Sequence, residues 1–147
     1  MFPTGALTLG PVTQMGSQAI GPGGLQLEFT AEERAFRAEV RAFIAGHYPA
    51  DVRAKQDQGI ELGKEDYLRW HRIVAKQGWS VPAWPVEYGG TGWSATQRHI
   101  WAEELQRADT APIIAFSTNL IGPVIYTFGT PEQKARFLPR IVAGDDW

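Results

Sequence analysis

The sequence predicts an all-α domain of five or six helices. In three places a Thr or Ser is followed three residues later by Glu or Gln, which is the capping box that starts many helices. These pairs are Thr30 with Glu33, Ser94 with Gln97, and Thr130 with Gln133. Apolar residues then recur at helical spacing, and no segment has the alternation of a strand with an obvious partner.

Two helices are predicted in the first half of the chain. The first runs from Thr30 to about Gly46, with an apolar face of Phe36, Val40, Phe43 and Ile44, and Pro49 follows its end. The second runs from Lys64 to Gln77, and Gly78 is placed as its C-terminal cap. Residues 51–63 are polar and weakly patterned, so we predict a loop with room for one short helix.

The stretch from Trp79 to Trp93 is predicted to be a rigid loop. It combines prolines, which fix the backbone, with glycines, which permit positive φ, so it suits neither helix nor strand. Its large aromatic side chains are expected to pin the loop to a core.

Three helices are expected in the second half. The helix from Ser94 to about Ala108 is predicted to bury Ile100, Trp101, Ala102 and Leu105, and to leave Glu103 and Glu104 solvated beside Arg107. Residues 111–128 are apolar on nearly every side, which is typical of a helix buried in the middle of its domain, and Pro123 should kink or divide it. The last helix, from Thr130 to Gly144, should be distorted by Pro139.

Composition limits the classes of function. The net charge of −2 is spread along the helices without the basic stripe of a nucleic-acid binder. The chain has no cysteine, which excludes disulfides and thiolate sites and fits a cytoplasmic protein. No apolar run is long enough to span a membrane. Residues 1–24 are rich in Gly and Pro without any period, so we expect a disordered extension before a folded part at 25–147.

No constellation of catalytic or metal-binding residues is found. The three histidines, His47, His71 and His99, lack the spacing of a metal site, so they are interpreted as surface or hydrogen-bonded side chains. The glycines at 89–92 match no phosphate-loop motif and are interpreted as loop-shaping residues. The serines have no nucleophile-elbow setting, which argues against a hydrolase.

Two segments resemble the acyl-CoA dehydrogenase family. Residues 79–92, WSVPAWPVEYGGTG, are similar to the "P-x-x-x-x-G-G-x-G" loop before a central helix of that family. Residues 129–144, GTPEQKARFLPRIVAG, resemble its more specific "G-T-x-E-Q-K-x-x-[YF]-L-P-x-[IL]-x-x-G" helix. The opening at 27–36, LEFTAEERAF, is similar to the family's first helix. The resemblance thus covers nearly all of residues 25–147.

This resemblance implies the N-terminal helical domain of a flavoenzyme that oxidises an acyl-CoA thioester between its α and β carbons. It implies FAD, an electron-transfer flavoprotein or similar acceptor, and a homodimer or homotetramer. The flavin contacts and the catalytic base belong to a β-domain and a C-terminal helical domain, so no catalytic, flavin-binding or metal-binding residue is assigned here, and the chain alone is expected to be inactive. The helix that borders the acyl chain in the family corresponds to residues Phe116, Ser117, Asn119, Leu120 and Val124.

Two alternatives stay open at this point. A family relative with other flavin chemistry, such as a nitroalkane oxidase or a flavin monooxygenase, would share these helices. A non-catalytic helical module for binding or interaction would also fit a chain of 147 residues.

Overall fold

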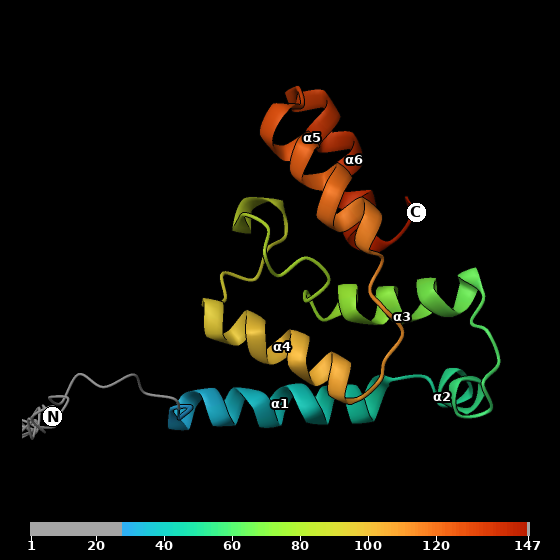
Figure 1. Ribbon diagram of the computed structural model, residues 1–147. Coiled ribbons are helices and arrows are strands. Elements are labelled where there is room, and N and C mark those ends of the chain that lie inside the picture. The colour runs from blue at the N-terminus through green and yellow to red at the C-terminus, as the bar shows by residue number, and fades with distance from the viewer. Residues whose placement is uncertain (1–27, 147) are drawn as a thin grey trace, which may run out of the picture.

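A computed structural model describes residues 28–146, and every regular element among them is helical (Figure 1). The predicted all-α class is therefore confirmed for the described part of the chain. The predicted extension at 1–24 and Trp147 lie outside it. The elements are α1 (Ala31–His47), α2 (Ala50–Asp57), α3 (Lys64–Lys76), the short 3-10 helix η1 (Val86–Tyr88), α4 (Ala95–Arg107), the π-helical turn η2 (Ser117–Ile121), α5 (Gly122–Phe128) and α6 (Pro131–Ala143).

The three predicted capping boxes are confirmed. The side chains of Thr30, Ser94 and Thr130 each accept a hydrogen bond from the backbone three residues on, and the Glu or Gln at that position bonds back to the cap. Each box satisfies two backbone N–H groups that a helix start leaves without partners, so these starts are fixed by local sequence. Gly78 and Gly144 follow helix ends with positive φ of 80° and 81°, as expected of C-terminal caps.

The short helix for which the prediction at 51–63 left room is α2, and the chain is irregular after Asp57. One helical prediction needs adjustment. The predicted distortion at Pro139 does not interrupt α6, which continues helical to Ala143.

The helices form two layers with separate cores. In one layer α1 packs against α4, and α3 covers the core between them. In the other, α5 and α6 form a hairpin at the end of the molecule away from α1, with α6 also contacting α3 (Figure 1). The first core is rich in aromatic residues and contains Val40, Phe43, Ile44, Trp70, Val74, Trp79, Trp101 and Ala111. The second, smaller core contains Val81, Trp84, Leu138 and Ile141.

The loop between α3 and α4 joins the two cores, as its aromatic content predicts. Trp79 enters the first core and Trp84 the second, and both rings are buried. The loop also folds tightly around Trp84, because a Cβ at Gly90 would lie 1.7 Å from the Trp84 carbonyl oxygen. Apart from the single 3-10 turn of η1, the loop has no regular structure, as predicted.

The segment from Ala111 to Phe128 differs most from its prediction. Residues 111–114 are not helical. Pro112 contributes to this, because the residue before a proline, here Ala111, disfavours the helical conformation. The helix begins at Ala115 and continues through η2 and α5. It is also not buried in the middle of the domain. α6 and the Trp84 loop cover one side, and no element among residues 28–146 covers the other.

Candidate functional site

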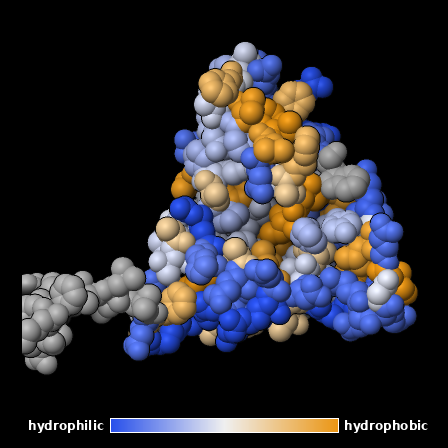
Figure 2. Space-filling view, viewed as in Figure 1, coloured by the Kyte–Doolittle hydropathy of each residue, from blue (hydrophilic) through white to orange (hydrophobic). Residues whose placement is uncertain are grey.

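The uncovered side of η2 and α5 carries a continuous apolar surface, which we call the apolar face. Its members are exposed to 69% at Phe116, 56% at Leu120, 42% at Ile121, 57% at Val124 and 81% at Phe128. Most are spaced four residues apart, so they follow one side of the helix. Figure 2 shows hydrophobic residues gathered over the α5–α6 hairpin, whereas the surface over α1 is hydrophilic.

Phe116 lies between two hollows beside this face. A groove of about 680 Å³ runs between α3, η2 and α6, and Phe116, Ser117 and Ile121 contribute to its wall. A second hollow of about 400 Å³ is lined by Tyr67, residues 112–115 and Phe116. The lining of the larger groove is mixed, with the apolar side chains Leu68, Ile125, Phe137 and Ile141 and the charged side chains Lys64, Glu65, Arg72, Asp145 and Asp146. A flat or chain-like apolar group could extend from the apolar part of the groove onto the apolar face.

The five residues predicted to line the acyl pocket are only partly brought together. Phe116 and Ser117 line the larger groove. Leu120 and Val124 belong to the exposed apolar face outside it, and Asn119 is exposed. Ser117 is buried, and its hydroxyl has no hydrogen-bond partner.

The π-helical turn leaves one carbonyl group without its usual helical partner. The N–H of Gly122 donates to Ser117 O, five residues back, instead of to Thr118 O. Pro123 has no N–H, so it cannot donate to Thr118 O either. Trp84 fills this gap, because its indole Nε1 donates to Thr118 O at 2.8 Å within the core.

The ring of Trp84 also requires a glycine in α5. A Cβ at Gly122 would lie 2.0 Å from Trp84 Cζ2, so only a residue without a side chain allows this close approach. Trp84 additionally packs edge-on against Tyr126, with 5.6 Å between ring centroids. Sequence reasoning missed Trp84 and Gly122 as residues that shape the candidate site. The sequence feature that could have indicated them is Pro123 within a helix, since proline has no N–H and a carbonyl one turn earlier then needs another donor.

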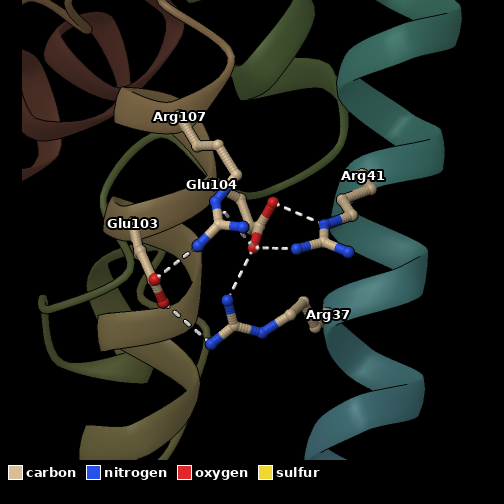
Figure 3. A network of polar contacts seen from close by, with 5 residues as sticks. All are labelled: Arg37, Arg41, Glu103, Glu104 and Arg107. Carbon is tan, nitrogen blue, oxygen red and sulfur yellow. Dashed lines mark hydrogen bonds and ion pairs between the residues drawn. The ribbon is translucent and has the colours of Figure 1, made fainter.

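The exposure of Glu104, which lies between α4 and α1, was predicted wrongly. Glu104 was expected on a solvated face, but it is 2% exposed. Its carboxylate accepts hydrogen bonds from Arg37 Nη1 at 2.7 Å, and from Arg41 Nε at 2.7 Å and Nη2 at 3.0 Å (Figure 3). Glu103, which is less buried, pairs with Arg37 and with Arg107 at 2.8 and 2.9 Å. Ala102, predicted to be buried, is exposed instead.

The carboxylate of Glu104, paired with Arg37 and Arg41, has a structural role and is not a general base. The hydrogen bond from Arg41 lowers the pKa of Glu104, although burial acts in the opposite direction. A carboxylate held ionised by two guanidinium groups is a poor proton acceptor near neutral pH. Its position between two helices indicates that it fixes how α4 packs on α1.

The histidines have the ordinary roles predicted for them. His47 Nδ1 donates to Phe43 O at 2.9 Å, and His99 is exposed. His71 is fully buried, and its Nε2 donates to Val142 O at 3.0 Å near the end of α6. Burial lowers its pKa, so the imidazole is neutral near neutral pH. In the described part of the chain, His, Asp and Glu form no group of three that could hold a metal ion.

None of the described helices is long and apolar enough to cross a membrane.

Comparison with known proteins gives a consistent result. The sequence matches the family described as acyl-CoA dehydrogenase, N-terminal domain, over residues 30–145. Acyl-CoA dehydrogenase IpdE1 of Mycolicibacterium smegmatis is 36% identical over 116 residues, which cover 76% of this chain and 30% of that protein. Acyl-CoA dehydrogenase FadE26 of Mycobacterium tuberculosis is 35% identical over 123 residues, 82% of this chain and 30% of that protein.

Solved structures agree with the sequence matches. The ChsE4–ChsE5 complex from Mycobacterium tuberculosis superposes with a TM-score of 0.68 at 32% identity, over 82% of this chain and 30% of that one. A structure described as the Tcur3481–Tcur3483 steroid ACAD gives a TM-score of 0.69 at 33% identity, over 82% of this chain and 31% of that one. The chain thus spans about 30% of the length of the relatives that it matches.

Proposed function

Because this chain belongs to the acyl-CoA dehydrogenase family and matches the N-terminal domain of that family, we propose that it forms one wall of the acyl pocket in an FAD-dependent acyl-CoA dehydrogenase. The observation that carries this proposal is the apolar face beside a groove of about 680 Å³. A soluble protein exposes a continuous apolar surface of this kind mainly where something binds to it.

The residues of the face suit a thioester's hydrocarbon part. The face has no polar side-chain atoms at Phe116, Leu120 and Val124. The charged side chains near Phe116 line the larger groove. Burial of each methylene group contributes about 0.8 kcal/mol, so contact with several carbons along the face gives substantial binding free energy. We propose that Phe116 and Leu120 contact the acyl group directly, and that Ser117, Asn119 and Val124 border it.

We assign the redox chemistry to parts of the protein outside the described residues. Among the described residues, the buried polar atoms without a hydrogen-bond partner are Arg37 Nη2, Trp70 Nε1, His71 Nδ1 and Ser117 Oγ. The one cation among them, Arg37, is already paired with Glu103 and Glu104 at 2.8 and 2.7 Å, so it is not available to a flavin pyrophosphate. Residues 28–146 therefore do not fit a flavin site, and we expect no dehydrogenase activity from them alone.

The relatives define which substrates and assemblies to test. One structural neighbour is described as a steroid ACAD and another as a complex of two differently named subunits. We propose a linear fatty acyl-CoA or a steroid acyl-CoA as substrate, within a homo-oligomer or hetero-oligomer that passes electrons to an electron-transfer flavoprotein or similar acceptor.

Displacement of a fluorescent fatty acyl-CoA from the 147-residue chain tests the pocket wall. Phe116→Ala should weaken binding by about tenfold, because a buried Phe side chain contributes about 1.5–3 kcal/mol. Val86→Ala is the matched control, since Val86 is also an exposed apolar residue, 65% accessible, but belongs to η1 and not to the apolar face. Equal affinities of the two variants would contradict the proposal, as would the absence of saturable binding.

A further inference from the structure

We propose that Trp84 is a positioning residue that holds residues 117–121 in the π register and thereby presents Phe116, in place of Ser117, on the apolar face. The functional consequence rests on the proposed acyl pocket, but the structural claim does not require it.

The exposure of the side chains shows the effect of the π turn. In a straight α-helix Ser117 would lie on the same side as Val124, because seven residues make almost two full turns. A π turn contains one residue more than an α turn, so the residues before it are rotated by roughly 100° around the helix axis. Phe116 then takes the place of Ser117, which agrees with exposures of 69% for Phe116 and 7% for Ser117.

Hydrogen bonding links this register to Trp84. In the π register the Gly122 N–H donates to Ser117 O, and Thr118 O accepts its hydrogen bond from the Trp84 indole N–H. In the α register the Gly122 N–H would bond Thr118 O itself. Loss of the indole N–H therefore leaves Thr118 O either buried without a partner or paired in the α register. Because an unpaired buried carbonyl is unfavourable, the α register should gain population.

The absence of cysteine from the chain permits a direct test. A Ser117→Cys reporter should react slowly with a thiol reagent, because the Ser117 hydroxyl is buried. Adding Trp84→Phe, which keeps an aromatic ring but removes the N–H, should raise the labelling rate by about tenfold or more. Phe116→Cys, at an exposed position, provides the rate of an accessible thiol, and Val40→Cys, at a fully buried position in α1, detects unfolding of the domain.

Trp70→Phe is the matched control, because the Trp70 indole N–H is buried but has no hydrogen-bond partner. It should leave the Ser117→Cys reporter protected. The proposal is overturned if Trp84→Phe leaves this reporter protected, or if Trp70→Phe exposes it equally.

Labelling of Val40→Cys in the Trp84→Phe chain would mean that the domain had unfolded. In that case the benzothienyl analogue of tryptophan at position 84, which keeps both rings and replaces N–H by sulfur, decides between the same two results. Labelling of Ser117→Cys with the analogue supports the proposal, and protection overturns it. No acyl ligand takes part in these experiments, so failure of the acyl-pocket proposal would not change their outcome.

Discussion

Replacement of Glu104 by Gln should destabilise the domain strongly. Gln has the same shape as Glu, but it lacks the charge, and its amide N–H group would face the donors of Arg37 and Arg41. Loss of one partner from a buried ion pair costs about 3–5 kcal/mol. Arg41 is half exposed and Arg37 keeps its contact with Glu103, so we expect a value near the lower limit, about 3 kcal/mol.

Urea unfolding followed by circular dichroism measures this change in the free energy of unfolding. The matched control is Glu103→Gln, since Glu103 is the neighbouring carboxylate and also pairs with Arg37, but its side chain is 33% exposed. The control should lose much less stability. The reasoning is refuted if both variants lose the same amount, or if Glu104→Gln retains the stability of the original chain with an unchanged urea dependence.

The dependence of stability on pH in the acidic range tests the ion pairs of Glu104 independently. The pKa of Glu104 is lowered in the folded chain, chiefly by the hydrogen bond from Arg41. Its contribution is therefore present above the pKa in the unfolded chain, about 4.3, and is lost as the pH falls through the lower folded pKa. Glu104→Gln should accordingly show a smaller loss of stability than the original chain over that acidic range.

The remaining predictions concern close packing and a buried imidazole. Gly122→Ala should lower stability by about 1–3 kcal/mol, because its Cβ would lie 2.0 Å from the Trp84 ring. Gly46→Ala, with no atom within 4 Å of the added Cβ in α1, should instead raise the melting temperature. Burial lowers the pKa of His71, so stability should fall as the pH drops below about 6.5, where the unfolded chain takes up a proton more readily. His71→Gln should remove this decrease, and urea midpoints measured across that range would show whether it does.

Local sequence was sufficient to predict three of the helix starts. The capping boxes at Thr30, Ser94 and Thr130 involve residues only three positions apart, so their hydrogen bonds do not depend on how the rest of the chain packs. The motifs at 79–92 and 129–144 likewise predicted the family, and the match over residues 30–145 confirms it.

Features that depend on distant partners could not be predicted in this way. The burial of Glu104 is compensated by Arg37 and Arg41, which lie 67 and 63 positions earlier in the chain. Helical spacing places Glu104 on the same face of α4 as the buried Ile100 and Trp101, but only these distant arginines make the burial of its charge possible. The register of η2 similarly depends on Trp84, which precedes Thr118 by 34 positions.

The apolar face shows a different limit of sequence reasoning. An apolar segment indicates that a helix is covered, but it does not identify what covers it. We predicted cover by the rest of the domain, whereas Phe116 and Phe128 are among the most exposed apolar side chains of the described residues. The proposed acyl group, together with its pocket, is the alternative cover.

The most direct test of this account is to map where a photoreactive acyl-CoA attaches to the chain. The probe carries a diazirine near the end of its acyl group, and the cross-linked peptides are identified by mass spectrometry. We predict attachment within residues 116–128, reduced by an excess of unmodified acyl-CoA. Attachment mainly on α1 to α4, or attachment that an excess of acyl-CoA does not reduce, would contradict the assignment of the apolar face as a wall of the acyl pocket.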